Sequence, residues 1–407
     1  MIPRLGNSTL ALWKEGYTFV SARCDELGAD VFRTRLLLRP VYCMRGAEAV
    51  SVFYDEERFG RAGSVPHSAQ HLLQDEGSVQ SLTGAAHHGR KALFLTQLTD
   101  ASVKRLAEIF AEEWRAALPG WARQRRIVLD DEVRLVLTKA ACRWAGLPLD
   151  EATAGRRSAE FGLMVDESAS FGPSNWYARR RRQETERWAA QALRELRSAG
   201  GAPDRSVAAA VALHRDEDGE LLPDAVAAVE LLNFLRPIVA VGRFITFAAV
   251  ALAQHPEWRA QVAEGSEDDR LAFAQEVRRY FPFFPFVGGT VRKPFDWEGH
   301  RFEEGEWALL DLYGTNHDPR LWENPESFDP ERFRGWTPDA QSLVPQGGGD
   351  VHRGHRCPGE STTLELLKAA AHLLAEPSGF SLPAQDLTVD LAHIPAVPRS
   401  RVILTTR

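Results

Sequence analysis

Helical periodicity dominates the distribution of apolar and polar residues along the chain. Apolar residues recur every three or four positions at about residues 101–117, 130–145, 174–198 and 267–281. Short apolar runs rich in β-branched and aromatic residues occur at residues 31–38, 41–44, around 289–302, at 307–312 and near 401–405. The first pattern predicts amphipathic helices and the second predicts strands. No internal repeat or long linker divides the sequence, so we expect a mainly α protein with small β-sheets, built as a single domain over residues 1–407.

The longest apolar stretch runs from Asp224 to Gln254 and predicts one helix that crosses the protein. About thirty residues at 1.5 Å rise reach roughly 45 Å. The charged residues within it make a membrane span unfavourable and favour a buried central helix. Pro237 removes a backbone donor and should bend the helix at that point. Arg236 precedes this proline among apolar residues, and a buried guanidinium needs an anion, either a protein carboxylate or the carboxylate of a ligand.

Composition and charge narrow the function classes. The 407 residues are 44% hydrophobic and 26% charged, with a net charge of −7, so no global basic field attracts nucleic acid. Four scattered cysteines suggest neither a disulfide framework nor a zinc site. The first residues lack an apolar segment of signal or anchor length. We expect a soluble cytoplasmic protein without a membrane anchor, in which the basic run at residues 179–182 is a solvated helix face.

Residues 346–360, QGGGDVHRGHRCPGE, carry the most specific chemistry. Their glycines let the backbone pass close to a flat group, and a helical pattern starts at Ser361, just after Cys357. A cysteine at a helix N-terminus, near cations such as His355 and Arg356, is expected to have a lowered pKa. A lone thiolate in that setting can ligate haem iron. The alternative is a buried, inert thiol.

The first quarter of the chain supplies cations that would suit a cofactor with two carboxylates. Arg61 lies in RAGSVP, and His87 and Lys91 are four residues apart, hence on one helical face. These three residues are candidates to pair with carboxylates. Without a cofactor, residues 79–91 would be only a polar loop that leads into a helix.

In chain order, several motifs resemble those of a cytochrome P450. They are Glu276-x-x-Arg279, the proline-punctuated segment 316–333 that ends in PERF, and the cysteine loop. Within that superfamily the chain most resembles the bacterial fatty-acid peroxygenases, nearly from end to end. The motifs that carry this likeness are RAGSVP, the segment 77–91 with Gln80 and HxxRK, LRPxxA at residues 235–240, and QGGGD…GHRCPGE.

Two positions separate the chain from ordinary P450 monooxygenases. Those enzymes have a phenylalanine seven positions before the cysteine, where this chain has Asp350. They also carry a threonine with an acidic neighbour in the central helix, where this chain has Arg236 and Pro237. Thr246 lies ten residues farther along, about 15 Å in a helix, which is too far to substitute.

The resemblance implies a cytochrome P450 fold and a role for each matching residue. Cys357 would be the axial thiolate ligand of haem b (iron protoporphyrin IX). The residues that would hold the haem propionates are Arg61, His87, Lys91 and His355. A structural ion network beneath the haem would consist of Glu276, Arg279 and Arg332.

On the substrate side, the resemblance implies that Arg236 binds the carboxylate of a long-chain fatty acid, with Gln80 and Pro237 nearby. Hydrogen peroxide would be the oxidant, with no obligatory redox partner. Cleaving a peroxide needs a positioned acid–base group. Pro237 has neither a hydroxyl nor an N–H, and Arg236 is too basic, so the substrate's own carboxylate can take this role. Because that carboxylate is held over the iron, oxidation should occur at the α and β carbons.

Three points stay open in the sequence. Because the amide of Gln80 has no accessible pKa, we expect hydroxy acids to outweigh a terminal alkene. Gln74 and Arg243 stand where relatives have apolar residues; we expect Arg243 to pair with a protein carboxylate, the alternative being a second anionic group of the substrate. The competing functions are an olefin-forming decarboxylase, an electron-fed monooxygenase, and a non-catalytic haem- or fatty-acid-binding protein.

Overall fold

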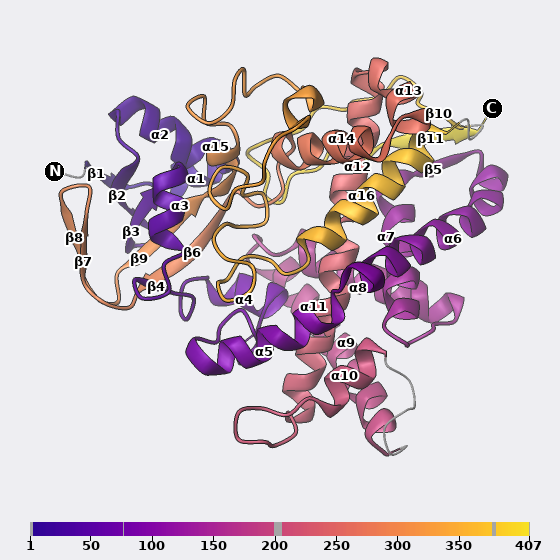
Figure 1. Cartoon of the computed structure of the whole chain (residues 1–407), viewed down its shortest axis with the longest axis horizontal. Helices are drawn as coiled ribbons and strands as arrows, with labels where there is room; N and C mark the ends of the chain where they lie inside the picture. Colours follow the sequence, from indigo (N-terminus) through magenta and orange to yellow (C-terminus); the bar gives the residue numbers. More distant parts are fainter. Residues whose placement is uncertain (1–2, 76, 199–205, 377–379, 407) are drawn as a thin grey trace.

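A computed structural model describes residues 3–75, 77–198, 206–376 and 380–406. Figure 1 shows a sheet region at the N-terminal end and a larger helical body beside it. The largest sheet has six strands in the order β1-β2-β3-β9-β6-β4. Their bounds are Arg4–Asn7 (β1), Val31–Leu36 (β2), Arg39–Met44 (β3), Trp307–Asp311 (β9), Phe286–Val291 (β6) and Phe59–Gly60 (β4). Because β3 pairs with β9, the first sixty residues lie against a segment from the last third of the chain.

Two smaller sheets complete the β structure. One consists of β10 (Phe380–Ser381), β11 (Ile403–Thr406) and β5 (Arg126–Val128), and the other of β7 (Phe295–Trp297) and β8 (His300–Phe302). The predicted strands are confirmed in position. The run around residues 289–302 is nevertheless divided into β6, β7 and β8, because Glu298 and Gly299 turn the chain with φ of 49° and 66°.

The helical body confirms the expectation of a mainly α protein. The helices before the centre of the chain are α1 (Thr9–Glu15), α2 (Phe19–Leu27), α3 (Ala47–Phe53), α4 (His67–Leu73), α5 (Gly84–Gln97), α6 (Asp100–Gln124), α7 (Leu129–Trp144), α8 (Glu151–Asp166), α9 (Pro173–Ser198) and α10 (Val207–Leu213). The later ones are α11 (Asp224–Ala240), α12 (Gly242–Gln254), α13 (Glu257–Glu264), α14 (Glu267–Tyr280), α15 (Leu312–Asn316) and α16 (Glu360–Ala375), with 3₁₀ turns at Gly16–Thr18 and Pro330–Phe333. Helix α16 crosses the body diagonally and packs against α6, α12, α13 and α14 (Figure 1).

The central helix is buried, as expected, but its interruption lies one turn later than predicted. The segment Asp224–Gln254 is apolar enough to cross a membrane by composition, yet 89% of its most apolar window is buried inside the protein. Helix α11 continues through Pro237 and ends at Ala240. The amide of Val241 donates to the oxygen of Ile238 at 3.1 Å, a tightened turn that separates α11 from α12.

The basic run on α9 differs from its predicted solvated face. Arg182 is 3% exposed, and its Nε lies 2.6 Å from Glu186. Arg181 contacts Glu160, which is fully buried, at 2.7 Å. The helical period explains the difference. Four consecutive residues, each rotated by about 100° from the one before, are distributed around the whole helix, so at least one of them faces the core.

Candidate active site

Cys357 lies three residues before α16, at the end of a loop that packs against α3. Gly347 and Gly349 have φ of 95° and 76°, where a side chain would be strained. A Cβ on Gly347 would approach the hydroxyl of Tyr54 at 2.5 Å, and one on Gly348 would approach Val50 at the same distance. The glycines therefore make room for α3 and the residue that follows it.

Asp350 shapes the same loop. Its Oδ1 accepts hydrogen bonds from the backbone amides of His352 and Arg353, each at 2.7 Å. The Arg353 amide holds the pKa of this carboxyl below its usual value. The aspartate that distinguishes this chain from ordinary monooxygenases thus stabilises a turn.

Among the four cysteines, Cys357 alone is accessible in part, whereas Cys24, Cys43 and Cys142 are buried. The amide nitrogen of Gln346 lies 3.9 Å from its sulfur and also donates to the hydroxyl of Thr363 at 2.9 Å. Burial raises the pKa of the Cys357 thiol, although the Gly359 amide acts in the opposite direction. The predicted lowering of this pKa is therefore wrong, because desolvation outweighs the helix N-terminus. Coordination to a metal ion deprotonates a thiol outright, so iron ligation stays open.

The four residues predicted to hold a cofactor carboxylate are cationic or imidazole groups buried wholly or in part near this loop. Arg61 donates to the oxygen of Gly288 at 3.1 Å and stacks on Phe53, with 4.2 Å from the guanidinium carbon to the ring centroid. Burial lowers the pKa of Arg61. Lys91 donates to the carbonyl oxygens of Gly354 and Arg356 in the cysteine loop, and burial lowers its pKa to about 8.

The two histidines of this group stack on each other. The ring centroids of His87 and His355 are 4.1 Å apart. Burial and neighbouring cations lower the pKa of His87 to about 4 and that of His355 to about 2. In the described part of the chain, no carboxylate forms an ion pair with Arg61, Lys91 or either histidine. Arg61 and Lys91 are thus buried cations without a carboxylate partner in the described residues, and the two histidines are neutral near pH 7. This group beside a partly accessible thiol fits an anionic cofactor with a thiolate-ligated iron, and haem is such a cofactor.

Arg236 is buried and has no counter-ion among the residues that the structure describes. It is 6% exposed, and its Nη1 donates to the carbonyl oxygens of Leu72, at 3.2 Å, and Leu73 at the end of α4. No carboxylate contacts it among the residues that the structure describes. Burial, and then the nearby Arg182, lower its pKa to about 9. A carboxylate brought to this guanidinium would remove the cost of a lone buried charge.

A polar network orients Arg236 and connects it with Gln80. The side-chain oxygen of Asn233 accepts from Arg236 at 3.3 Å, and its nitrogen donates to Gln80 at 3.2 Å and to Glu230 at 3.1 Å. Ser78 donates to the same Gln80 oxygen at 2.9 Å. With its amide oxygen held by two donors, Gln80 is a fixed, neutral group close to the predicted substrate site.

Glu230 anchors the other end of this network. It is fully buried and accepts from Arg90 at 2.6 Å and from the amide of Val79 at 2.9 Å. Burial raises the pKa of Glu230, against the effect of Arg90. The carboxylate therefore ties α11 to the segment that carries Gln80.

Pro237 and Ala240 are the partly exposed positions within the buried stretch from Leu231 to Ala240. They are three residues apart and thus share one face of α11. Thr246 is fully buried and bonds to Asp130 at 3.3 Å and to the oxygen of Gly242 at 2.9 Å. The structure thus separates Thr246 from the Arg236 network, as the spacing predicted.

Arg243 forms the protein ion pair that we expected. Its Nη2 lies 2.5 Å from Asp166 at the end of α8, and its Nη1 donates to the oxygen of Ala396 at 2.7 Å. Asp166 also contacts Arg134 at 2.6 Å, and Arg134 contacts Asp130 at 2.9 Å. The arginine is thus part of a charge-balanced network that joins α8, α12 and the C-terminal segment.

The predicted network of Glu276, Arg279 and Arg332 is also confirmed. Arg279 and Glu276 are fully buried and form a bidentate pair with two 2.7 Å contacts. The Nε of Arg332 lies 3.4 Å from Glu276. Arg279 further donates to the carbonyl oxygens of Asn316 and Pro325, so the pair fixes the segment before the cysteine loop.

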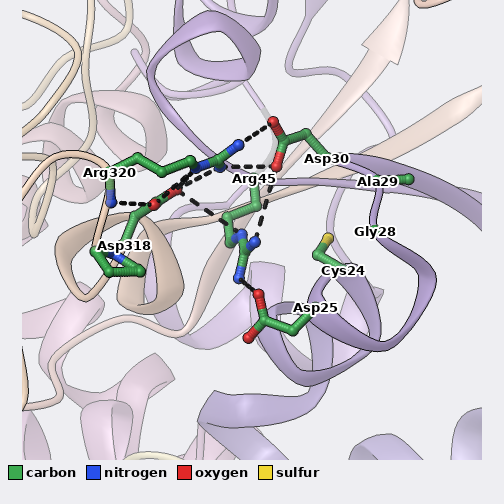
Figure 2. A pocket seen from close by; sticks show the side chains of 9 residues that line it. Cys24, Asp25, Gly28, Ala29, Asp30, Arg45, Asp318 and Arg320 are labelled. Carbon is green, nitrogen blue, oxygen red and sulfur yellow. Dashed lines mark hydrogen bonds and ion pairs between the residues drawn. The ribbon is translucent and has the colours of Figure 1, made fainter.

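A separate surface pocket of about 360 Å³ lies at the N-terminal end, next to α2 (Figure 2). Its charged residues pair with one another: Arg45 contacts Asp25 at 2.7 Å, and Arg320 bridges Asp30 at 2.7 Å and Asp318 at 2.5 Å. These contacts join α2 to the loop after α15 and leave no feature that indicates catalysis.

Sequence reasoning missed three residues of the site, Asn233, Glu230 and Gln346. Asn233 precedes Arg236 by three positions, a spacing that places both on one helix face. Glu230 is one of the charged residues that make the segment Asp224–Gln254 unfavourable as a membrane span, and its sequence position alone does not indicate a role in the site. Gln346 opens the cysteine loop, and no local pattern indicates its contact with the sulfur.

Comparison with known proteins places these features in a family. A family model described as Cytochrome P450 matches residues 272–360. The chain is similar to a putative cytochrome P450 137 of Mycobacterium tuberculosis, with 24% identity over 348 residues, which span 80% of this chain and 70% of that protein. It is also similar to human cytochrome P450 4A11, with 27% identity over 48% of this chain and 39% of that protein.

Solved structures give a fuller match. Cytochrome P450SP alpha (CYP152B1), solved in complex with (R)-ibuprophen, is 42% identical over 98% of both chains, with a TM-score of 0.94. Cytochrome P450EX alpha (CYP152N1) with myristic acid is 38% identical over 100% of this chain and 98% of that one, also with a TM-score of 0.94. A single-residue variant of cytochrome P450 OleT in complex with arachidonic acid is 30% identical to this chain. The match covers 100% of this chain and 98% of that one, with a TM-score of 0.95.

Proposed function

The chain belongs to the cytochrome P450 family, on its CYP152 branch, and from that membership we propose that it is a haem-thiolate peroxygenase that uses hydrogen peroxide to hydroxylate fatty acids at the α or β carbon. One observation carries the proposal: Arg236 is buried in the central helix without a carboxylate partner in the described part of the chain. Two related proteins with solved structures bind fatty acids, which supports this substrate class.

We assign the cofactor site to residues that fit haem. Cys357 would ligate the iron, and Arg61, His87, Lys91 and His355 would pair with the propionates. When bound, haem supplies cleavage of the peroxide O–O bond and oxidation of the nearby substrate. Arg61 and Lys91 would supply the positive charge, and the two histidines, neutral near pH 7, would donate hydrogen bonds. None of the four has a carboxylate partner in the residues described, so all are free to take this role.

Arg236 would bind the fatty-acid carboxylate through a charge-assisted pair. Asn233 holds the guanidinium at 3.3 Å, so its orientation is set before substrate arrives. With the carboxylate fixed, the α and β carbons are the carbons nearest to it and hence to the reacting centre. This geometry is the proposed basis of regioselectivity.

The substrate carboxylate would also carry the proton that peroxide cleavage requires. Pro237 offers no donor, and Arg236 stays protonated, so neither side chain can exchange that proton. The carboxylate oxygens are basic enough to accept it and to return it. A fatty acid is therefore required for peroxide use as well as for product formation.

Gln80 would favour hydroxylation over decarboxylation. Its amide oxygen is held by Ser78 and Asn233, and an amide does not titrate near neutral pH. A histidine at this position could donate a proton and assist loss of carbon dioxide. We expect hydroxy acids as the main products and a larger share of terminal alkene from Gln80→His.

The test is product analysis after the haem-loaded protein is mixed with hydrogen peroxide and a saturated long-chain fatty acid, without a reductase. We expect α- and β-hydroxy acids. Turnover only with an electron-transfer partner would favour the monooxygenase, and fatty-acid binding without any product would favour a carrier. Alkene as the main product would overturn the assignment of Gln80.

A further inference from the structure

Two buried arginines on different helices bind the end of α4. The last carbonyl groups of a helix have no donor within it, so other groups must satisfy them. Arg236, on α11, donates to the oxygens of Leu72 and Leu73. Arg182, on α9, donates to the oxygen of the next residue, Gln74, at 3.3 Å. Three consecutive carbonyl groups are thus divided between the two arginines, and two helices hold the end of α4 at once.

The residue after this turn has an unusual backbone conformation. Asp75 has φ of 85°, in the left-handed region that residues with a side chain rarely occupy. Its carboxylate lies 3.7 Å from Nη2 of Arg182 and 3.0 Å from Nδ1 of His71. A strained residue persists only where its surroundings hold it, and such residues are frequent at functional sites. Arg182 and His71 supply part of this hold.

The same segment is connected to the central helix through side chains. The hydroxyl of Ser78 shares its proton between the backbone oxygen of Asp75, at 2.8 Å, and the amide oxygen of Gln80, at 2.9 Å. Gln80 accepts from Asn233, and the side-chain oxygen of Asn233 accepts from Arg236. A second route therefore leads from the end of α4 to Arg236, in addition to the direct contacts with the carbonyl groups.

Arg182 is a structural cation, because its charge is balanced within the fold. It is 3% exposed, and its Nε lies 2.6 Å from Glu186. With Asp75 as a second carboxylate nearby, it does not need a ligand as counter-ion. It nevertheless acts on Arg236, whose pKa it lowers as the second cause after burial. The two guanidinium groups thus interact, and of the two, Arg236 is the one without a carboxylate partner in the described part of the chain.

The direction of the Arg236 guanidinium decides how well it can bind an anion. Three of its five N–H donors have partners among the described residues, in Leu72, Leu73 and Asn233, which leaves two for a carboxylate. A two-point pair between a guanidinium and a carboxylate depends on the relative orientation of the two groups. The carbonyl groups of Leu72 and Leu73 fix this orientation as long as the end of α4 keeps its place.

We propose that Arg182 is a positioning residue for the carboxylate site. It fixes the end of α4, whose carbonyl groups direct the guanidinium of Arg236 toward the fatty-acid carboxylate. This role rests on the proposed function, in which Arg236 binds that carboxylate. Binding can be measured without turnover and separately for each arginine, so the role of Arg182 and the proposed function can fail independently.

The experiment compares the affinity of a saturated fatty acid with that of its methyl ester, by calorimetry on the haem-loaded protein. In Arg182→Met the preference for the acid should fall about tenfold, as expected for residues coupled in one network, whereas ester affinity should stay within about twofold. Arg182→Lys should restore little of the preference, since one ammonium cannot bind Glu186 and the end of α4 together. Equal losses for acid and ester would show a purely structural role, and full preference in Arg182→Lys would show that charge alone acts. Either result would overturn the proposal.

The matched control is Arg181→Met, one residue earlier on α9. Arg181 pairs with the buried Glu160 at 2.7 Å and with Glu184 at 2.5 Å, and it forms no hydrogen bond or ion pair with α4 in the described residues. This variant also loses ion pairs of α9. Its preference for the acid should nevertheless stay within about twofold of that of the unaltered protein.

Asp75→Gly tests the same contact while both arginines are kept. Glycine adopts φ of 85° without strain, so the turn is retained while a carboxylate partner of Arg182 is lost. The acid preference should fall about threefold, and the double variant Asp75→Gly/Arg182→Met should lose no more than Arg182→Met alone. Fully additive losses would overturn the proposal.

Arg236→Met separates this role from the proposed function, because it should abolish the acid preference. If it does so while Arg182→Met keeps the preference, Arg182 has no positioning role and the proposed function stands. An unchanged preference in Arg236→Met would overturn the proposed function itself.

Discussion

Arg236 and Arg243 lie seven residues apart on the central helices, and both are buried, yet their surroundings differ. Arg243 is 4% exposed and pairs with Asp166 at 2.5 Å. Arg236 is 6% exposed and, among the described residues, has only the carbonyl groups of Leu72 and Leu73 and the amide oxygen of Asn233 as partners. One arginine has its counter-ion built into the fold, and the other has a place where a counter-ion can bind.

This difference teaches how to separate a structural charge from a functional one. Burying a lone cation costs several kcal/mol, and a protein carboxylate offsets most of that cost. At Arg243 the fold supplies the carboxylate. At Arg236 the described residues supply only the dipoles of carbonyl and amide groups, and burial lowers the pKa of Arg236 to about 9. The sequence shows two arginines in the same apolar stretch, and only the three-dimensional contacts tell them apart.

The largest expected effect is on catalysis. Arg236→Met should lower kcat/KM for peroxide-dependent fatty-acid oxidation by about thirtyfold to a few thousandfold, because loss of a buried charge partner costs about 2–5 kcal/mol. Arg243→Met, its matched control, should stay within about tenfold of the unaltered protein. Both variants should keep the haem spectrum. A short carboxylic acid should not rescue Arg236→Met, since no cation remains to hold it; equal losses in the two variants would break the distinction.

Stability should change in opposite directions. Arg236→Met leaves three acceptors without this donor, two carbonyl groups and the side-chain oxygen of Asn233, at about 1 kcal/mol each. It also removes a lone buried charge that costs several kcal/mol. We therefore expect the substrate-free protein to gain about 1–3 kcal/mol. Arg243→Met leaves the Ala396 carbonyl unpaired and removes one partner of Asp166, so a loss of about 1–3 kcal/mol is expected. Melting temperatures under identical conditions check both signs, and a stability loss in both variants would contradict the comparison.

Asp166→Asn should make Arg243 resemble Arg236. The amide no longer neutralises Arg243, whereas Arg134 keeps its partner Asp130 at 2.9 Å, so Arg243 becomes available to a second anionic group. Dicarboxylic acids should then bind about three- to tenfold more tightly than monocarboxylic acids of equal length, whereas the unaltered protein should show no preference. Spectral titration of the haem-loaded protein with both acids measures the ratio. A preference for dicarboxylic acids already present before the substitution would mean that Asp166 does not satisfy Arg243.

The smallest effect concerns pH. Binding needs an ionised substrate carboxylate, whose pKa is about 4–5 in water, and a protonated Arg236. Affinity should therefore fall below about pH 5, as the carboxylate is protonated, and above about pH 9, as Arg236 loses its proton. Between these limits it should stay nearly constant. Fatty-acid affinity measured across this range checks the profile, and Arg236→Met should abolish both limbs. An unchanged acid limb in that variant would show that another cation holds the carboxylate.

Local patterns predicted the mainly α fold class and which of the candidate residues share a helix face. The spacing of His87 and Lys91 placed both on one face of α5, and the pair Glu276–Arg279 forms as the helical period requires. These predictions succeeded because the contacts lie within one helix turn or in one specific motif. The helix break lies at Val241 and not at Pro237 as predicted. The proline determines which backbone hydrogen bond is lost, but the packing of the neighbouring elements determines where the helix is interrupted.

The features that the sequence did not predict depend on contacts between residues far apart in the chain. The lowered pKa expected for Cys357 assumed a solvated helix end, but desolvation by the folded chain dominates. The crowding of the loop glycines by Tyr54 and Val50 comes from residues in the first sixty positions of the chain. Asn233 could not be predicted, because an asparagine in a helix can have many structural roles. Only its contacts with Arg236 and Gln80 show that it connects these two residues.

The central claim is that the guanidinium of Arg236 binds the fatty-acid carboxylate. The most direct test is a double-mutant cycle in which one change is made in the protein and the other in the ligand. Binding of a saturated fatty acid and of its methyl ester is measured by calorimetry for the haem-loaded protein and for Arg236→Met. We predict a coupling energy of about 3–5 kcal/mol between the carboxylate and Arg236, and a value near zero for the same cycle at Arg243. A coupling below about 0.5 kcal/mol at Arg236, within the range of independent sites, would contradict the account.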